Sequence, residues 1–251
     1  MACIRMSLRS RVLDVDTVVN VVIPYDHFDR EGRPKPFTRT LYLLHGLRQN
    51  ADAWQRMSSA ERFANYYGYA LIMPDAQRSF YTDMAHGPRF FTYLTEELPE
   101  IMQAMFKIPA DPAHTYVGGL SMGGYGALKC ALRAGDVFSR GASLSGAADI
   151  RQLPPGGYWE DVFGPREQIP GSFNDLFAAA KALPPENRPP LYMWCGTEDS
   201  LLPGNHALRD HLLALGYDLT YAESAGNHAW QWWDLHIQDV LRWLFPQTEV
   251  K

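Results

Sequence analysis

Hydrophobic and polar positions follow two different periods along the chain, and their alternation predicts an α/β fold. Short apolar runs at 40–44, 69–74, 115–118 and 191–195 are typical of strands that are buried on both faces of a sheet. Elsewhere, apolar residues recur at helical spacing, which predicts helices that pack on this sheet. These stripes comprise Leu94, Leu98, Ile101, Met105 and Ile108 in one segment, and Trp233, Ile237, Val240 and Leu244 in the closing segment.

The first part of the chain carries a period of two instead. From 12 to 24, apolar residues fall on one face, and only Thr17 interrupts them. Such alternation is typical of a strand with one buried face. We expect this strand to pair antiparallel with residues 2–9 at the edge of the sheet.

Two local signals mark helix starts. Ser58 and Glu61 fit a capping box, which predicts a helix that runs through Tyr67. Pro99 lacks the N–H that a helix interior needs, so it must lie in a first turn or kink the helix that contains it.

The motif Gly119-Leu120-Ser121-Met122-Gly123 fits G-x-S-x-G and lies between the apolar run 115–118 and the helix-forming run 125–132. A sharp turn between a strand and a helix pushes the serine hydroxyl out of the sheet, and glycines on both sides make room for the turn. The motif therefore predicts a nucleophile at Ser121. An ordinary glycine-rich loop between a strand and a helix would show the same pattern. A matching acid and histidine elsewhere in the chain are needed to distinguish the two interpretations.

A serine nucleophile needs a base that takes its proton and an acid that orients the base. The run 191–195 leads into a turn that carries Asp199, and a last strand at 219–222 is followed by a loop that ends in His228. The order serine, acid, histidine is that of an α/β-hydrolase, and all three residues follow strands. We therefore predict a triad of Ser121, Asp199 and His228, with Asp199 preferred over its neighbour Glu198.

Acyl transfer also needs donors that bind the developing oxyanion. In this fold they are the N–H of the residue after the nucleophile and an N–H from the loop after the third strand. These positions predict Met122 and Leu47, because Gly46 lets the backbone approach a carbonyl closely. His45 ends an apolar strand, and we interpret it as a structural residue.

Several longer motifs are more specific to one protein family than G-x-S-x-G is. They are Tyr-Leu-Leu-His-Gly at 42–46, Arg-Ser-Phe-Tyr-Thr-Asp at 78–83, Glu-Glu-Leu-Pro at 96–99, Gly-Leu-Ser-Met-Gly-Gly-Tyr-Gly-Ala at 119–127 and Cys-Gly-Thr-Glu-Asp at 195–199. From about residue 10 to residue 245 the chain resembles the tributyrin esterase branch of the esterase D family, which also includes feruloyl esterases and S-formylglutathione hydrolases.

The resemblance implies an α/β-hydrolase fold and carboxylester hydrolysis, with the family's serine, aspartate and histidine on Ser121, Asp199 and His228. One departure is visible near the base. Relatives commonly read Gly-Gly-His, whereas this chain has Asn227 before the histidine. Asparagine tolerates left-handed backbone angles, so we expect the loop to keep its shape.

The stretch 149–190 is rich in proline and glycine and is longer than an ordinary connection between strands. We interpret it as a cap inserted into a single domain that spans residues 1–251. The alternative is a long surface loop without a functional role. Aromatic residues in the cap and in two other loops are then candidates for substrate contact. They are Tyr158 and Trp159 in the cap, and Trp54, Phe80 and Tyr81 on the opposite wall.

Composition narrows the function further. The chain has 251 residues, is 46% hydrophobic and carries a net charge of −5, which suits one domain with a sizeable core and argues against nucleic acid as a partner. No apolar run of about 18 residues predicts a membrane span, and the first residues lack a signal-peptide pattern, so we expect a cytoplasmic protein. The three cysteines are odd in number and predict reduced, mostly buried thiols.

No cofactor or metal is expected. His206 and His211 are five residues apart, a spacing that puts them on different sides of a helix. The glycines around Ser121 lack the lysine of a phosphate-binding loop and the spacing of a dinucleotide fingerprint.

The sequence therefore predicts a serine carboxylesterase that acts on short-chain acyl or feruloyl-type esters. The expected partner is a small-molecule ester, and a homo-oligomer stays open. Two alternatives share the triad: an S-formylglutathione hydrolase-like thioesterase and an acyltransferase. A non-catalytic binding module is the alternative from another class.

Overall fold

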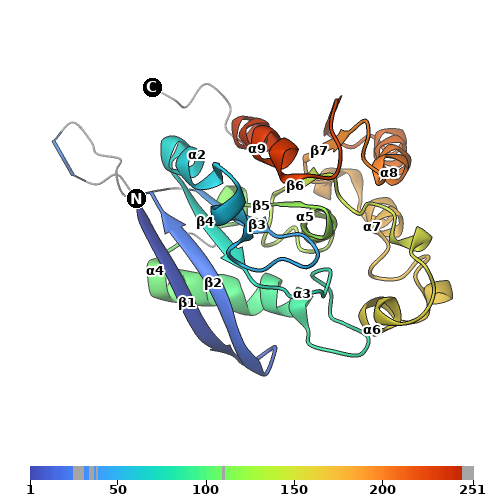
Figure 1. The fold of residues 1–251 in the computed structure, drawn as a ribbon, viewed down its shortest axis with the longest axis horizontal. Coiled ribbons are helices and arrows are strands. Elements are labelled where there is room, and N and C mark those ends of the chain that lie inside the picture. Colours follow the sequence, from blue (N-terminus) through green and yellow to red (C-terminus); the bar gives the residue numbers. More distant parts are fainter. Residues whose placement is uncertain (25–30, 34–36, 38, 109–110, 245–251) are drawn as a thin grey trace.

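The central feature is an eight-stranded sheet in the order β1-β2-β4-β3-β5-β6-β7-β8 (Figure 1). The structure is a computed structural model that describes residues 1–24, 31–33, 37, 39–108 and 111–244. β1 and β2 are antiparallel, β2 is antiparallel to β4, and all further pairs are parallel. The strands are β1 (Ala2–Ser10), β2 (Val15–Ile23), β3 (Arg39–Leu44), β4 (Tyr69–Pro74), β5 (Thr115–Leu120), β6 (Arg140–Leu144), β7 (Leu191–Gly196) and β8 (Leu219–Ser224).

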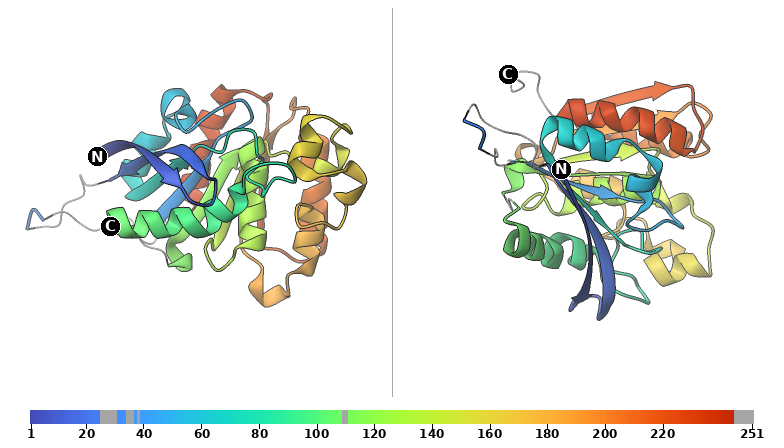
Figure 2. Two further views of the ribbon diagram at one scale, coloured as in Figure 1. Left: turned by 90° about the horizontal axis from the view of Figure 1, so that it is seen from below. Right: turned by 60° about the vertical axis from the view of Figure 1, so that its left-hand side comes forward.

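Helices cover both faces of the sheet, and each face has its own core (Figure 2). In β4, Ala70 and Ile72 belong to one core while Leu71 and Met73 belong to the other, because successive strand residues point to opposite faces. One face is covered by α1 (Ala53–Met57), α2 (Ala60–Tyr67) and α9 (Trp230–Leu244), and the other by α4 (Leu98–Phe106), α5 (Met122–Arg133), α7 (Leu176–Ala182) and α8 (Leu202–Ala214). The buried parallel strands explain the continuous apolar runs in the sequence.

The antiparallel hairpin at the sheet edge confirms the expected pairing of the first two strands. The helix expected to run through Tyr67 is α2, but the capping box at its start forms only in part. Ser58 Oγ accepts from the N–H of Ala60 over 3.2 Å, whereas Glu61 accepts hydrogen bonds from Cys3 and Gln55. The N–H of Ser59 donates to Asp234 Oδ1 over 2.5 Å. A contact from α9 thus completes the start of α2.

Pro99 lies near the start of α4, directly after a π-helical turn at Tyr93–Glu97 that continues from α3 (Phe90–Thr92). The wider turn fits a proline, which cannot donate to the carbonyl four residues earlier. Leu98 and Met102 are buried on this helix, whereas Met105 is 60% exposed. Met105 therefore lies outside the buried stripe that the sequence predicted.

Residues 149–190, between β6 and β7, contain short elements only. These are 3₁₀ turns at Ile150–Gln152, Arg166–Gln168 and Pro185–Asn187, together with α6 (Tyr158–Phe163) and α7. α6 lies against the loop after β4, where Ala85 N–H and His86 N–H donate to the carbonyls of Val162 and Asp161. Among the described residues, no helix is long and apolar enough to cross a membrane.

Candidate active site

Ser121 occupies the sharp turn between β5 and α5. Its backbone is strained, with φ 53° and ψ −116°. A Cβ on Gly123 would lie 2.3 Å from the carbonyl oxygen of Leu44, and one on Gly119 would lie 2.4 Å from the carbonyl oxygen of Gly123. Only glycine leaves room for this approach, so the two glycines of the motif allow β3, β5 and the start of α5 to meet. The turn has the geometry expected of a nucleophile elbow.

Asp199 and His228 lie beside Ser121 at the carboxyl ends of neighbouring strands. His228 Nε2 is 2.9 Å from Ser121 Oγ, and His228 Nδ1 is 2.8 Å from Asp199 Oδ2. The side chain of Asp199 is fully buried, and that of His228 is 34% exposed. The three groups therefore form one hydrogen-bonded chain that runs from a buried carboxylate to an accessible hydroxyl.

The surroundings of Asp199 keep it ionised. Burial opposes the charged form, but hydrogen bonds from His228 and from the N–H of Leu201 outweigh burial and hold the pKa of Asp199 below its ordinary value. Its neighbour Glu198 is exposed, and only its backbone is engaged here, donating to Gly226 O. The structure thus brings Asp199, and not Glu198, to the histidine.

The loop before His228 is shaped by a close contact between two strand ends. A Cβ on Gly196 would lie 2.1 Å from the carbonyl oxygen of Gly226, and Gly226 itself has φ 156°. Asn227 has no positive φ; its side chain accepts a hydrogen bond from Trp232 Nε1. The asparagine at this position therefore needs no left-handed backbone, since the loop takes its unusual angles at the glycine.

Leu47 lies in the loop after β3, and Met122 directly follows Ser121. Met122 is the first residue of α5, so its N–H has no acceptor within the helix. Before Leu47, the N–H of Gly46 donates to Gln49 Oε1 over 2.9 Å, and after it Arg48 takes φ 66°. These contacts fix the shape of the loop after β3 beside the serine.

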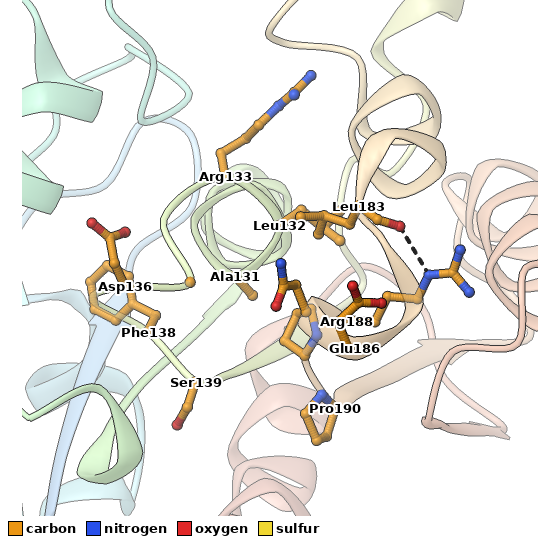
Figure 3. A pocket seen from close by; sticks show the side chains of 13 residues that line it. Ala131, Leu132, Arg133, Asp136, Phe138, Ser139, Leu183, Glu186, Arg188 and Pro190 are labelled. Carbon is orange, nitrogen blue, oxygen red and sulfur yellow. Dashed lines mark hydrogen bonds between the residues drawn. The ribbon is translucent and has the colours of Figure 1, made fainter.

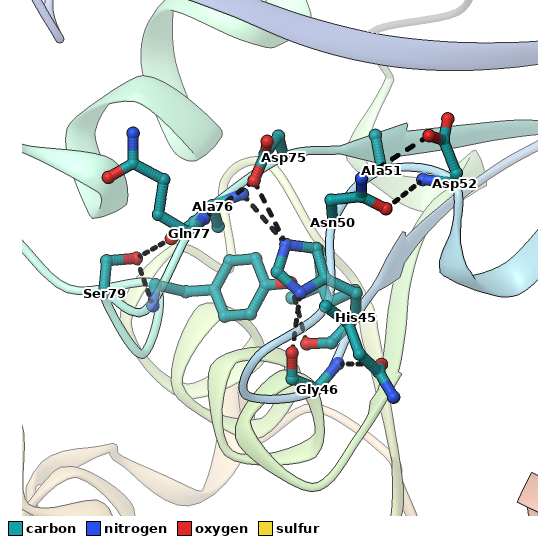
Figure 4. A network of polar contacts seen from close by, with 12 residues as sticks. His45, Gly46, Asn50, Ala51, Asp52, Asp75, Ala76, Gln77 and Ser79 are labelled. Carbon is teal, nitrogen blue, oxygen red and sulfur yellow. Dashed lines mark hydrogen bonds and ion pairs between the residues drawn. The ribbon is translucent and has the colours of Figure 1, made fainter.

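His45 is a buried structural residue, as expected. It is 1% exposed, and its Nε2 accepts a hydrogen bond from the N–H of Ala76 over 3.0 Å, while Nδ1 lies 2.8 Å from Gly46 O (Figure 4). Tyr81 donates to the carbonyl of His45. The imidazole thus ties the loop after β3 to the loop after β4.

Comparison with known proteins agrees with this geometry. The model of the family described as putative esterase matches residues 10–244. The chain belongs to this esterase family. An acetyl esterase from Caldicellulosiruptor saccharolyticus is 30% identical over 261 residues, which cover 97% of this chain and 98% of the relative. The resemblance to the esterase D family is therefore confirmed.

Two solved structures from Staphylococcus aureus are similar over 97% of this chain and 98% of theirs, each with 28% identity. The fluorophosphonate-binding serine hydrolase F has a TM-score of 0.87, and an S-formylglutathione hydrolase has a TM-score of 0.84. These likenesses confirm the α/β-hydrolase fold and place this esterase-family chain among serine hydrolases.

Three of the five aromatic residues expected to contact substrate are buried. Trp54 is 1% exposed, donates to Leu44 O and packs edge-on against Trp230 in the core under α9. Phe80 and Tyr81 are 3% and 1% exposed, and both have positive φ. The structure therefore leaves little of Trp54, Phe80 or Tyr81 open to solvent, and their contact with a substrate stays a prediction.

Tyr158 and Trp159 of α6, in the stretch predicted to form a cap, are half-buried. Trp159 packs against Phe80 with ring centroids 5.4 Å apart, and Tyr158 donates to the carbonyl of Arg78, whose guanidinium lies 4.0 Å above the phenol ring. The rings of Phe80, Tyr125 and Phe163 complete one aromatic cluster. Phe80 therefore joins the loop after β4 to the cap.

Lys129 of α5 is a buried polar residue that the sequence analysis missed. Its Nζ donates to Thr82 Oγ1 and Asn174 Oδ1 and lies 4.8 Å from the centre of the Phe91 ring. Burial lowers the pKa of Lys129 to about 7. A lysine inside the otherwise apolar and small-residue run 125–132 was the available signal. The residue links the cap segment, through Asn174, to the helix that begins at the serine.

An apolar cavity of about 240 Å³ lies beside the site. Its wall includes Ala147, whose N–H donates to Ser121 O, and Leu201, whose N–H donates to Asp199. Ile150, Leu153 and Pro203 add apolar surface. The cavity is therefore adjacent to both Ser121 and Asp199.

A larger cavity, of about 510 Å³, lies elsewhere (Figure 3). Its lining comes from the chain just before β6 and just before β7, including Phe138, Arg188 and Pro190. It therefore opens at the amino ends of these strands, whereas the three site residues follow carboxyl ends. Ligands of such sheets bind at the carboxyl ends of the strands. The larger volume of this cavity therefore does not make it the candidate active site.

Within the described ranges, no group of three or more histidine, cysteine, aspartate or glutamate side chains could hold a metal ion. His206 bonds to Glu223 and His211 to the carbonyl of Phe177, so they point to different partners. Cys130 and Cys195 are buried free thiols, whereas Cys3 is exposed, so the expectation of mostly buried thiols holds except at Cys3.

Proposed function

We propose that this protein is a serine carboxylesterase that hydrolyses short-chain acyl or hydroxycinnamoyl esters through an acyl-enzyme. The observation that carries the proposal is the hydrogen-bonded chain from Asp199 through His228 to Ser121. Membership of the esterase family and likeness to serine hydrolases support it.

In the first step, Ser121 Oγ attacks the ester carbonyl while His228 Nε2 takes its proton. Asp199 accepts the Nδ1–H of the imidazole, which fixes the tautomer that leaves Nε2 free and stabilises the imidazolium that forms. The N–H groups of Leu47 and Met122 bind the oxyanion of the tetrahedral intermediate. His228 then gives the proton to the leaving alcohol.

In the second step, water takes the place of the alcohol. His228 removes a proton from the water, and the hydroxide attacks the acyl-enzyme. The tetrahedral intermediate collapses, the acid leaves, and the proton returns to Ser121. The partial exposure of His228 supports this step, because a water molecule can reach the imidazole from solvent.

The cavity of about 240 Å³ supports a short apolar acyl group. It begins at Ala147 and ends among Ile150, Leu153 and Pro203. A longer or aromatic acyl group would need additional surface, and the half-buried Trp159 is our candidate for it. We therefore expect activity to peak at short acyl chains.

The direct test has two parts. A fluorophosphonate should label Ser121 covalently, and mass spectrometry of the digested protein should find the adduct on the peptide that contains it. The p-nitrophenyl esters of acetate, butyrate, hexanoate and octanoate, with methyl ferulate, then define the acyl preference. An unlabelled Ser121, together with no turnover of any ester, would refute the proposal.

A thioesterase is the second candidate, because the S-formylglutathione hydrolase of Staphylococcus aureus is 28% identical over nearly the whole chain. The same three residues can cleave both bonds, since an acyl-enzyme forms in each case. S-formylglutathione assayed beside p-nitrophenyl acetate separates the two functions. A kcat/KM that is at least about a hundredfold higher for the thioester would favour the thioesterase.

A further inference from the structure

A cavity of about 360 Å³ opens beside the loop that follows β3. It is separate from the apolar cavity of about 240 Å³, which is lined by residues that follow β6 and β7. Three segments form its walls: the loop after β3, helix α1, and the first residue of α9. Its lining includes Arg48, Gln49, Asn50, Arg56, Met57 and Trp230. Arg48 and Arg56 thus give the lining positive charge, Gln49 and Asn50 give it amide groups, and Met57 and Trp230 give it apolar surface.

The two arginines in this cavity form no ion pair with a residue in the described part of the chain, whereas other arginines do, such as Arg209 with Asp210. The nearest acid in the sequence is Asp52, and it is already engaged by Arg5 and by Asn20 Nδ2. Both arginines are exposed, and no acidic residue lines the cavity, so its lining carries a net positive charge. Their positive potential favours an anionic ligand.

The apolar wall connects the cavity to the catalytic histidine. Trp230 packs edge-on against Trp54 at 5.2 Å and against Trp233 at 5.5 Å, and Trp233 packs against His228 at 4.9 Å between ring centroids. Trp54 is held in turn by its hydrogen bond to Leu44 O. The cavity is therefore linked to His228 through the rings of Trp230 and Trp233.

We propose that this cavity binds the leaving group of the substrate, and that this leaving group carries a carboxylate. The inference rests on the proposed esterase function. His228 must protonate the departing oxygen, so the leaving group lies on the side of His228, where Trp230 begins the cavity. Guanidinium groups are the side chains best suited to bind a carboxylate.

The parts of the cavity match the parts of such a leaving group. Trp230 and Met57 cover an aromatic or aliphatic stem, and Arg48 and Arg56 bind the carboxylate. Gln49 uses Oε1 to accept from Gly46 N–H, which leaves its amide NH₂ as a further donor. In the reaction, the bond from Ser121 Oγ to the acyl carbon forms, the bond from that carbon to the leaving oxygen breaks, and this oxygen takes the proton from His228.

A matched pair of substrates tests the inference. The acetyl esters of 3-(4-hydroxyphenyl)propanoate and of 3-(4-hydroxyphenyl)propanamide differ in charge, and two methylene groups insulate the phenol from this difference. We expect the ratio of kcat/KM, anionic over neutral, to be about ten in the wild type at low salt and to fall as salt is added. Arg48→Gln or Arg56→Gln should lower the ratio about threefold each, and the double variant should bring it close to one.

Arg62→Gln is the matched control, because Arg62 is exposed, carries the same charge and stacks over Phe63 outside the cavity. It should leave the ratio unchanged. A wild-type ratio near one, or equal losses in Arg62→Gln and Arg56→Gln, would overturn the inference while the turnover of the neutral ester upholds the esterase.

If neither ester is turned over, the esterase proposal fails, and a binding measurement still decides about the cavity. Titration of the Ser121→Ala protein with 3-(4-hydroxyphenyl)propanoate, followed by NMR, should show saturable binding that the double arginine variant loses. The amide should bind at least about threefold more weakly. Equal binding of the acid and the amide would overturn the inference independently of catalysis.

Discussion

The chain Ser121–His228–Asp199 and the aromatic cluster under the cap lie on neighbouring loops, but they are held in different ways. Backbone constraints fix the first: the turn at Ser121 exists because Gly119 and Gly123 allow contacts that no side chain would permit. Side-chain packing fixes the second, in which Phe80 joins α6 to α5 and the buried Lys129 reaches across to Asn174.

This difference has a consequence for mutation. In the proposed mechanism, each residue of the hydrogen-bonded chain has one chemical role. Replacing one of them should therefore remove nearly all activity and leave the fold intact. In the aromatic cluster, many contacts contribute to stability. Replacing one side chain should therefore have a partial effect, on the free energy of unfolding or on substrate preference. The four predictions below test this contrast, from the largest expected effect to the smallest.

Ser121→Ala should lower kcat by about 10⁴ to 10⁶, because the oxyanion donors and substrate binding alone remain. The measurement is the hydrolysis of p-nitrophenyl acetate, with circular dichroism as a check of folding. Ser200→Ala removes an exposed hydroxyl in the loop after β7 and serves as the control. A folded Ser121→Ala protein that keeps more than about a tenth of the wild-type rate would remove Ser121 from the mechanism.

Asp199→Asn should lower kcat by about 10³ to 10⁴, because an amide cannot hold the imidazole in the tautomer that accepts the serine proton. Glu198→Gln should cost less than about tenfold, since Glu198 is exposed and does not reach His228. The two variants change the same charge one residue apart. The opposite ranking would show that Glu198 is the acid.

The hydrogen-bonded chain could be predicted from the sequence and the aromatic cluster could not, because backbone constraints fix the first and side-chain packing fixes the second. The sequence was sufficient to place Ser121, Asp199 and His228 because each follows a readable strand, and because close backbone contacts require glycine at fixed positions. It also predicted the hairpin of β1 and β2 from a period of two. The hydrogen bonds that join the three side chains support these choices, and the experiments above test their catalytic roles.

The cluster could not be predicted in this way, because long-range packing decides it. Trp54 looks like a loop aromatic in the sequence, and only the fold shows that it lies under Leu44 and Trp230. Lys129 appears as one charge in a helix and gains its partners from segments about 45 residues away on either side. The start of α2 also depends on a distant residue, since Asp234 of α9 accepts from the N–H of Ser59.

Lys129→Met should change the pH dependence of stability. Burial holds the pKa of Lys129 at about 7, below its ordinary value of 10.5. Between these values the folded protein binds fewer protons than the unfolded chain, so the free energy of unfolding should rise with pH in this window and lose that gain as pH falls toward 7. Urea unfolding at several pH values measures this slope.

In Lys129→Met, this contribution to the slope should vanish, while Lys181→Met, at an exposed lysine of α7, should keep it. Asp83, Cys130 and Arg133 are the charged or titratable groups that act on Lys129, and they are retained in the variant. Parallel pH profiles for the wild type and Lys129→Met would mean that Lys129 remains charged in the folded protein throughout, held by Thr82, Asn174 and the aromatic rings.

Trp159→Ala is the smallest expected effect, and it tests whether the cap takes part in recognition. Trp159 is half-buried and packs against Phe80 and Tyr158, so its ring can both support the cluster and meet a substrate. A lost apolar contact changes kcat/KM by about tenfold for a group that reaches it, and leaves a smaller group unaffected. We therefore expect a loss about fivefold to tenfold greater for methyl ferulate or p-nitrophenyl octanoate than for p-nitrophenyl acetate. Trp159→Phe keeps a ring at this position and should retain most of the preference. Equal losses on all esters would assign Trp159 to packing alone, and no loss on any of them would place the cap away from the bound acyl group.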